Sequence, residues 1–279
     1  MRWRYFGPSS NHDKNHIKPV SAAAVRDAPN WEECRVKLTD QQKKFFDDFG
    51  YIFLPGLMVQ EVDWIIEEYE RAFADNGIEH DGTKRSSLGK IIERNERFFN
   101  LLDNPKVVGL LSGLMGDDYN YLGSGADLYV GDGMWHPDCH DAPVVQLKWA
   151  MYLDPLTRDT GALRVVPGSH KQRWVGNLDT KALWGISDEE VPCAAPDNTP
   201  GDVLVFNQST LHNSIKGGNR RRMLNIVTCA HCETDEEIQF LRRRLPGMRD
   251  DLMWNRLVET AGDERMRHLR QPLSVMNGA

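Results

Sequence analysis

The chain has 279 residues, of which 40% are hydrophobic and eight are tryptophan, enough apolar side chains for a sizeable core. Its formal net charge is −7 and its charges are mixed along the chain, which argues against nucleic acid or an anionic membrane surface as the main partner. No stretch approaches the ~20 apolar residues of a membrane span, and residues 1–8 lack the apolar centre of a signal peptide. We therefore expect a cytoplasmic protein.

The five cysteines do not form a disulfide pattern. They are Cys34, Cys139, Cys193, Cys229 and Cys232, an odd and scattered set. Cys229 and Cys232 form a CxxC, but no second pair accompanies it, and a closed zinc site needs four ligands. We expect ordinary thiols.

The beginning of the chain differs from the rest. Residues 1–37 are polar, contain proline and show no periodicity, so we expect an N-terminal arm there, followed by a single domain over 38–279. The first helix begins at Thr39, which forms a capping box with Gln42, and it ends at Gly50.

Both strands and helices are predicted after this first helix. Residues 51–54 are predicted as a strand, and the helical spacing of apolar side chains predicts helices over 60–74 and 101–114. From Ala126 the pattern changes to short strands separated by turns. The predicted strands cover residues 128–130, 144–153, 162–166, 203–206 and 223–228.

The strand-rich part, about 120–230, is typical of a sandwich or a barrel because its strands are short and bounded by turn residues. Two helices, predicted over 235–245 and 250–269, occupy a C-terminal region of 234–270 and would brace the strands from outside. The predicted fold class is mainly β with flanking helices.

One segment between the first helices is predicted as a loop. Residues 76–95 contain several glycines, many charges and few apolar residues. A long loop in a compact domain is either functional or mobile. This loop could form part of a lid, with Lys84 or Arg85 contacting a substrate.

The pattern His136-x-Asp138 suggests a metal site. On extended backbone, residues two apart project to the same side, so this imidazole and this carboxylate can hold one cation. His212 offers a second imidazole. Two histidines and one carboxylate on one face are the ligand set of non-haem Fe(II) proteins. An HxD alone is not specific, so its context matters.

Arginines supply that context. Arg220, Arg221 and Arg222 open an apolar run after His212. An arginine that enters a strand is costly to bury without an anion, and its planar guanidinium can hold a carboxylate by two parallel hydrogen bonds. The metal face and the arginine together suggest a dicarboxylate co-substrate bound on iron.

Several ordered motifs resemble the phytanoyl-CoA dioxygenase (PhyH)-like family of Fe(II)/2-oxoglutarate oxygenases over about residues 38–230. The motifs are Leu38–Gln42, Gly50–Gly56, His136–Asp138, Asp159–His170, Pro200–Phe206, His212–Ser214 and Arg221. The resemblance implies a double-stranded β-helix, also called a jelly roll or cupin-like barrel.

The resemblance also implies the roles of the site residues. His136, Asp138 and His212 would bind Fe(II), with O2 and 2-oxoglutarate at the remaining positions. Arg221 would hold the far carboxylate of 2-oxoglutarate, although Arg220 and Arg222 stay open as alternatives. Ser214 would be a second contact to that carboxylate, and Trp149 would line the pocket.

The implied reaction is hydroxylation of an unactivated C–H, with release of succinate and CO2. Related halogenases carry a small residue in place of the carboxylate ligand, so Asp138 predicts hydroxylation rather than halogenation. Cys139 and His140 are expected near the site, His140 in the surroundings of the metal or in the substrate pocket, because Pro137 opposes the helix that a His136–His140 ligand pair would need.

Three alternatives are open. Desaturation, epoxidation or cyclisation would use the same cofactors. A cupin-like metal isomerase or hydrolase would use the same ligands without 2-oxoglutarate, and a binding module would use only the fold. We expect a small-molecule substrate, polar or anionic, because Lys84, Arg85, Gln146, Lys148 and Arg164 lie on candidate pocket segments. The oligomeric state is not readable.

Overall fold

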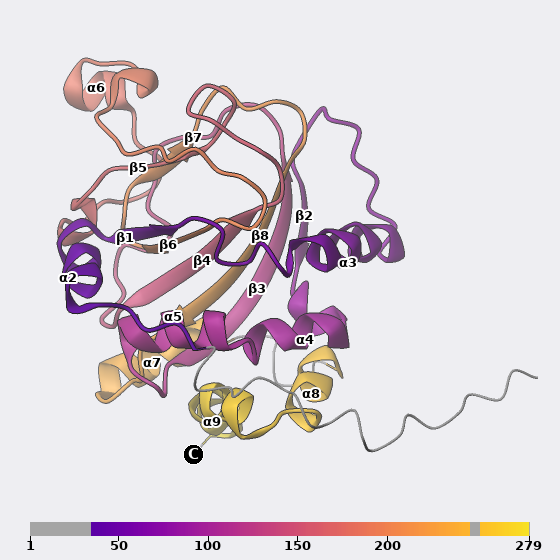
Figure 1. The fold of residues 1–279 in the computed structure, drawn as a ribbon. Helices are drawn as coiled ribbons and strands as arrows, with labels where there is room; N and C mark the ends of the chain where they lie inside the picture. Colours follow the sequence, from indigo (N-terminus) through magenta and orange to yellow (C-terminus); the bar gives the residue numbers. More distant parts are fainter. Residues whose placement is uncertain (1–34, 246–251, 279) are drawn as a thin grey trace, which may run out of the picture. The chain divides into compact units, whose positions relative to one another are not determined.

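The computed structural model describes residues 35–245 and 252–278. The described residues belong to the unit Arg35–Ala279. The predicted arm therefore lies almost wholly outside the described residues. Within this unit, the main element is an antiparallel sheet (Figure 1).

Six strands of the described chain form this sheet in the order β1-β6-β4-β8-β3-β2. They are β1 (Tyr51–Leu54), β6 (Val203–Asn207), β4 (Gln146–Tyr152), β8 (Arg221–Cys229), β3 (Asn120–Tyr129) and β2 (Ser86–Gly89). All their pairings are antiparallel. A smaller sheet pairs β5 (Leu163–Val165) with β7 (His212–Ser214).

The two faces of the large sheet differ because side chains alternate along each strand. On β4, Trp149 and Met151 belong to the main apolar core, which also includes side chains of the helices. Lys148 and Tyr152, on the opposite face of the same strand, line a cavity. Figure 1 shows α4, α5, α7, α8 and α9 at one side of the sheet, away from β5 and β7, whereas α6 lies on the side of β5 and β7.

Local sequence signals explain the helices. Thr39 and Gln42 make the expected capping box, and Gly50 ends the first helix with a left-handed φ of 77°. The helices are α2 (Asp40–Phe49), α3 (Val62–Asp75), α4 (Glu96–Leu102), α5 (Pro105–Met115), α6 (Thr180–Trp184), α7 (Asp235–Arg244), α8 (Leu252–Glu259) and α9 (Asp263–Asn277).

Several predictions of elements were wrong in detail. Residues 76–95 are not all loop, because β2 pairs with Gly125–Leu128 of β3. The predicted helix over 101–114 is two helices, since Asn104 caps a new helix that has Pro105 in its first turn. The predicted helix over 250–269 is divided between α8 and α9.

The fold class needs a similar correction. The sheet is the centre of the fold and helices flank it, as predicted, but helices contain more residues than strands do. The strand pairings of the described residues form two separate sheets and no closed barrel. Over the same residues, no helix combines the length and the apolar composition needed to span a membrane.

Candidate metal centre and its pocket

The two histidines of the predicted metal face lie opposite each other. His136 and His212 form an antiparallel bridge, with backbone N–H···O distances of 3.2 and 3.0 Å. His212 opens β7, which is held in register by β5. The two ring centroids are 4.4 Å apart. The fold thus joins residues that lie 76 positions apart in the sequence.

Each ring is oriented by a backbone carbonyl two residues earlier. Nδ1 of His136 lies 2.7 Å from the carbonyl O of Met134, and Nδ1 of His212 lies 3.0 Å from that of Thr210. A carbonyl oxygen only accepts, so Nδ1–H is the donor in both rings. Nε2 of each ring therefore carries the lone pair, which is the arrangement found in metal-ligating histidines.

Asp138 completes the group. Its Oδ1 is 3.8 Å from Nε2 of His136, and its Oδ2 is 3.6 Å from Nε2 of His212. The three ligand atoms lie within 4.8 Å of one another. Two ligands about 2.1 Å from one ion lie about 3 Å apart at right angles and about 4.2 Å apart when opposite. The donor atoms therefore fit one shared metal ion.

Charges around this group favour the forms that bind metal. Burial lowers the pKa of His212 to about 4, despite the nearby charge of Asp138. The imidazole is therefore neutral at neutral pH. Burial is the largest single influence on Asp138 and would raise its pKa, but the charge and hydrogen bond of Lys148, together with His212 and His136, outweigh it and hold that pKa well below its usual range. Nζ of Lys148 lies 2.6 Å from Oδ2 of Asp138.

The group opens into a cavity of about 610 Å³, a size ordinary for small-molecule sites. Its lining includes all three candidate ligands together with Arg221 and Ser214. It also includes residues of five neighbouring strands of the large sheet, β6, β4, β8, β3 and β2. The cavity therefore lies on the face of the large sheet opposite the main core.

Arg221 is buried in this cavity wall, with 3% exposure. Its Nη1 donates to the carbonyl O of Gly161 and to Oγ of Ser214. Gly161 and Gly217 let the guanidinium lie there, because a Cβ at either position would stand less than 3 Å from it. Among the described residues, no carboxylate forms an ion pair with Arg221. An unpaired buried guanidinium fits an anionic ligand.

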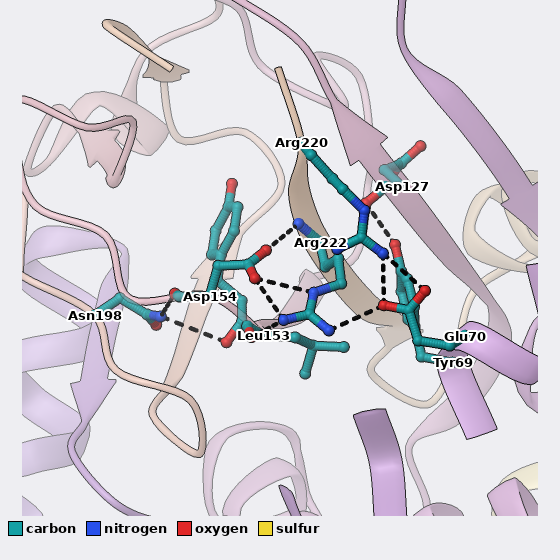
Figure 2. Close-up of polar contacts among 9 residues, drawn as sticks. Tyr69, Glu70, Asp127, Leu153, Asp154, Asn198, Arg220 and Arg222 are labelled. Atoms are coloured by element: carbon teal, nitrogen blue, oxygen red, sulfur yellow. Dashed lines mark hydrogen bonds and ion pairs between the residues drawn. The ribbon is translucent and has the colours of Figure 1, made fainter. Parts of the chain in front are cut away.

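The side chains of Arg220 and Arg222 point towards Glu70 and Asp154 (Figure 2). Nη2 of Arg220 lies 2.7 Å from both carboxylate oxygens of Glu70. Arg222 binds the same Glu70 and donates to Asp154. Both guanidinium groups thus have carboxylate partners outside the cavity lining. Of the three candidates, only Arg221 reaches the pocket.

The predicted role of Trp149 is wrong. This side chain is fully buried in the main core and is not part of the cavity lining. The strand alternation explains the error, since Lys148 and Trp149 are neighbours and must face opposite sides. Gln146 and Arg164 are likewise buried away from the cavity, and Lys84 does not line it, whereas Arg85 does.

Cys139 and His140 also lie outside the cavity lining. Cys139 is buried, with its Sγ 3.9 Å from Oδ1 of Asp141, and His140 is exposed. His140 therefore does not lie in the substrate pocket, which was one of the two places expected for it, and Cys139 is a buried neighbour of the candidate ligand Asp138. Asp127 and Asn225 are among the pocket residues that the sequence analysis missed. Their positions on the strands, two residues from other pocket-facing side chains, could have identified them.

The site now defines a class of protein. Two imidazoles and one carboxylate on one face, with free space beside them, are the donor set of mononuclear non-haem iron proteins. The family model for phytanoyl-CoA dioxygenase (PhyH) matches residues 46–223. The chain therefore belongs to the phytanoyl-CoA dioxygenase (PhyH) family, which supports the dioxygenase class and confirms the resemblance seen in the sequence.

Two relatives show how far sequence similarity extends. Dioxygenase FUM3 of Gibberella moniliformis (strain M3125 / FGSC 7600) is 25% identical over 234 residues, which cover 71% of this chain and 74% of that protein. A probable phytanoyl-CoA dioxygenase of Caenorhabditis elegans is 26% identical over 133 residues, which cover 44% of this chain and 41% of that protein. The second match thus spans less than half of either protein.

Solved structures show the same fold at low identity. The non-heme alpha ketoglutarate dependent carbocyclase SnoK from nogalamycin biosynthesis has a TM-score of 0.58 at 19% identity, covering 69% of this chain and 84% of SnoK. EctD from S. alaskensis, with 2-oxoglutarate and 5-hydroxyectoine, has a TM-score of 0.59 at 22% identity, covering 69% and 76%. The epimerase SnoN has 0.57 at 19%, covering 75% and 89%.

Proposed function

We propose that this protein is an Fe(II)- and 2-oxoglutarate-dependent dioxygenase that hydroxylates an unactivated C–H of a small-molecule metabolite, with release of succinate and CO2. The observation that carries the proposal is the convergence, in one cavity, of the His136–Asp138–His212 group and the unpaired guanidinium of Arg221. Structural neighbours that bind 2-oxoglutarate support it.

Each residue has a defined task in this proposal. His136 and His212 would bind iron(II) through Nε2 and Asp138 through its carboxylate; iron(II) and 2-oxoglutarate, when bound, would activate O2, the oxidant of the C–H chemistry. Arg221 holds the far carboxylate of 2-oxoglutarate. Ser214 orients that guanidinium, since its Oγ accepts from Arg221 and donates to the carbonyl O of Gly161.

Residues near the reacting position exclude water and fix orientation. Phe206 packs on the His212 ring, with centroids 4.7 Å apart, and also lines the cavity. Lys148 holds the Asp138 carboxylate from the β4 side. We further propose that the catalytic domain spans 38–279 and that its two sheets form the double-stranded β-helix of the structural neighbours, which are 2-oxoglutarate oxygenases.

Another oxidative outcome is the alternative function. SnoK is a carbocyclase and SnoN an epimerase, and both have this fold. Desaturation, epoxidation or cyclisation would need the same metal face and the same Arg221. The metal isomerase or hydrolase without 2-oxoglutarate would leave the buried guanidinium of Arg221 without an anion, which is costly.

An anaerobic titration tests the proposal. Metal is removed, Fe(II) is added, and 2-oxoglutarate is titrated while the weak visible charge-transfer band of the chelate is recorded. We expect the band in the wild type and its loss in His212→Ala and Arg221→Leu. Metal binding without a band would favour the isomerase or hydrolase. Admission of air with a metabolite panel, followed by product mass, separates hydroxylation from the other outcomes.

A further inference from the structure

The floor of the cavity has a row of small residues between its charged ends. The strand register aligns Ala150 of β4 with Asn225 of β8, then Gly125 of β3 and Gly89 of β2. Asn225, Gly125 and Gly89 all line the cavity. Three of these four residues carry no side chain beyond Cβ. The row is therefore a hollow across the sheet, in which the Asn225 amide is the large polar group.

The Asn225 amide is held in place by packing but has no hydrogen-bond partner among the described residues. The side chain rests over Gly125, where an added Cβ would stand 3.1 Å from Nδ2 and 3.4 Å from Oδ1. Asn225 is only 7% exposed. Among the described residues, no group forms a hydrogen bond with its amide. The amide therefore offers a free donor and a free acceptor to the cavity, and a ligand that pairs with both gains affinity.

Asp127 lies in the adjacent row, opposite Met223 and Ser87. Its Oδ1 accepts from Nε of Arg85 at 2.8 Å and from Oγ of Ser87 at 2.6 Å. Over the described part of the chain, no donor reaches its Oδ2. The carboxylate is 5% exposed and lines the cavity. Asp127 therefore retains acceptor capacity, while Arg85 neutralises its charge.

The charges of the cavity balance. The lining contains three cationic side chains, Arg85, Lys148 and Arg221, and three carboxylates, Asp127, Asp132 and Asp138. Lys148 is paired with Asp138, and Arg85 with Asp127. Arg221 is reserved for the co-substrate, and a divalent metal cancels the charge of dianionic 2-oxoglutarate. No positive charge is left for a second anion.

We propose that Asn225 and Asp127 form a substrate subsite for an uncharged polar group, a carboxamide or a hydroxyl, and not for a carboxylate or phosphate. The group would accept from Nδ2 of Asn225 and donate to Oδ1 of Asn225 or to Oδ2 of Asp127. A carboxylate could donate to neither oxygen, and the lining leaves no unpaired positive charge for it. This inference rests on the proposed function, because it assigns Arg221 to 2-oxoglutarate.

Matched probes test the subsite. The pairs are nicotinamide with nicotinate and benzamide with benzoate, which differ only in the charged group. Binding is titrated by ligand-observed NMR on the full chain loaded with Co(II) and 2-oxoglutarate. We expect each carboxamide to bind at least about tenfold more tightly than its carboxylate, and Asn225→Leu to remove that preference, because one hydrogen bond of this kind corresponds to about tenfold.

Controls separate the possible failures. Asn219→Leu replaces an exposed asparagine outside the cavity lining and should leave all four affinities unchanged. If Asn225→Leu does not fold, Asn225→Asp keeps the shape and should lower carboxamide affinity. Equal or tighter binding of the carboxylates overturns the proposal, as does an unchanged carboxamide affinity in the Asn225 variants. If Asn225→Leu weakens 2-oxoglutarate instead, the amide belongs to the co-substrate. Failure of the proposed function is detected separately, as the absence of the 2-oxoglutarate band in the wild type.

Discussion

The two faces of the large sheet are formed by the same strands but have different roles, one in the core and one at the cavity. One face carries Trp149, Leu224 and Ile226 and packs in the main apolar core. The other face carries Lys148 and Asn225 and lines the cavity. Each polar residue lies next in sequence to an apolar one. The period of the strand therefore separates stability from binding at every position.

This comparison explains why the metal group can be polar and buried at low cost to the fold. Apolar burial contributes roughly 25 cal/mol per Å², and the helix-covered face supplies most of it. The cavity face can then keep charged groups such as Lys148 and Arg221 in place. Changes on the core face should mainly affect unfolding, and changes on the cavity face should mainly affect the binding of ligands.

Trp149→Ala should give the largest effect. Loss of a fully buried tryptophan from the core should lower the free energy of unfolding by about 3–5 kcal/mol. Urea denaturation measures this change. Co(II) affinity should stay within a few-fold of the wild type at a temperature where the variant is folded. Loss of metal binding in the folded variant would show that the two faces are not separable.

His212→Ala, by contrast, should mainly lower the affinity for metal. Replacing a group that hydrogen-bonds to a metal ligand typically lowers metal affinity by about 10–100-fold. Loss of a ligand itself should therefore lower it by more than about 100-fold. Competition with a chelator of known affinity measures it. His170→Ala is the matched control, because this ring binds the carbonyl O of Asp47 outside the cavity lining. Equal metal affinity in the two variants would exclude the proposed centre.

Arg221→Leu should weaken 2-oxoglutarate by about 100-fold, because a charge-assisted pair of hydrogen bonds is lost. Titration of the charge-transfer band gives the affinity. Arg220→Leu is the control, since that guanidinium is exposed and paired with Glu70. A larger loss of 2-oxoglutarate affinity in the Arg220 variant would indicate that the co-substrate binds at Arg220, outside the cavity.

Lys148→Met should have the smallest effect. Without metal, the Asp138 carboxylate would lose its nearest positive charge, and stability should fall by about 1–2 kcal/mol after allowance for solvent screening. Added Co(II) should restore most of that loss, because the ion replaces the ammonium as the partner of Asp138. Denaturation with and without Co(II) measures both quantities. An equal loss in both conditions would assign Lys148 to packing alone.

Much of the site could be predicted from the sequence. The HxD pair and the arginine run are local patterns, and chemistry restricts which residues can bind iron or a carboxylate. Helix starts are equally local, as the Thr39–Gln42 capping box shows. The family resemblance favoured Arg221 but left Arg220 and Arg222 open, because their exclusion depends on Glu70 and Asp154, which lie far away in the sequence.

The sequence by itself determined the family and most strands and predicted the candidate ligand residues, since these follow from short motifs and from the period of apolar residues. Only the tertiary structure decided which face of each strand lines the cavity. One residue of register moves every side chain to the other face, and that register is set by pairing with distant strands. For this reason Trp149 was assigned to the pocket, and Asp127 and Asn225 were found only in the fold.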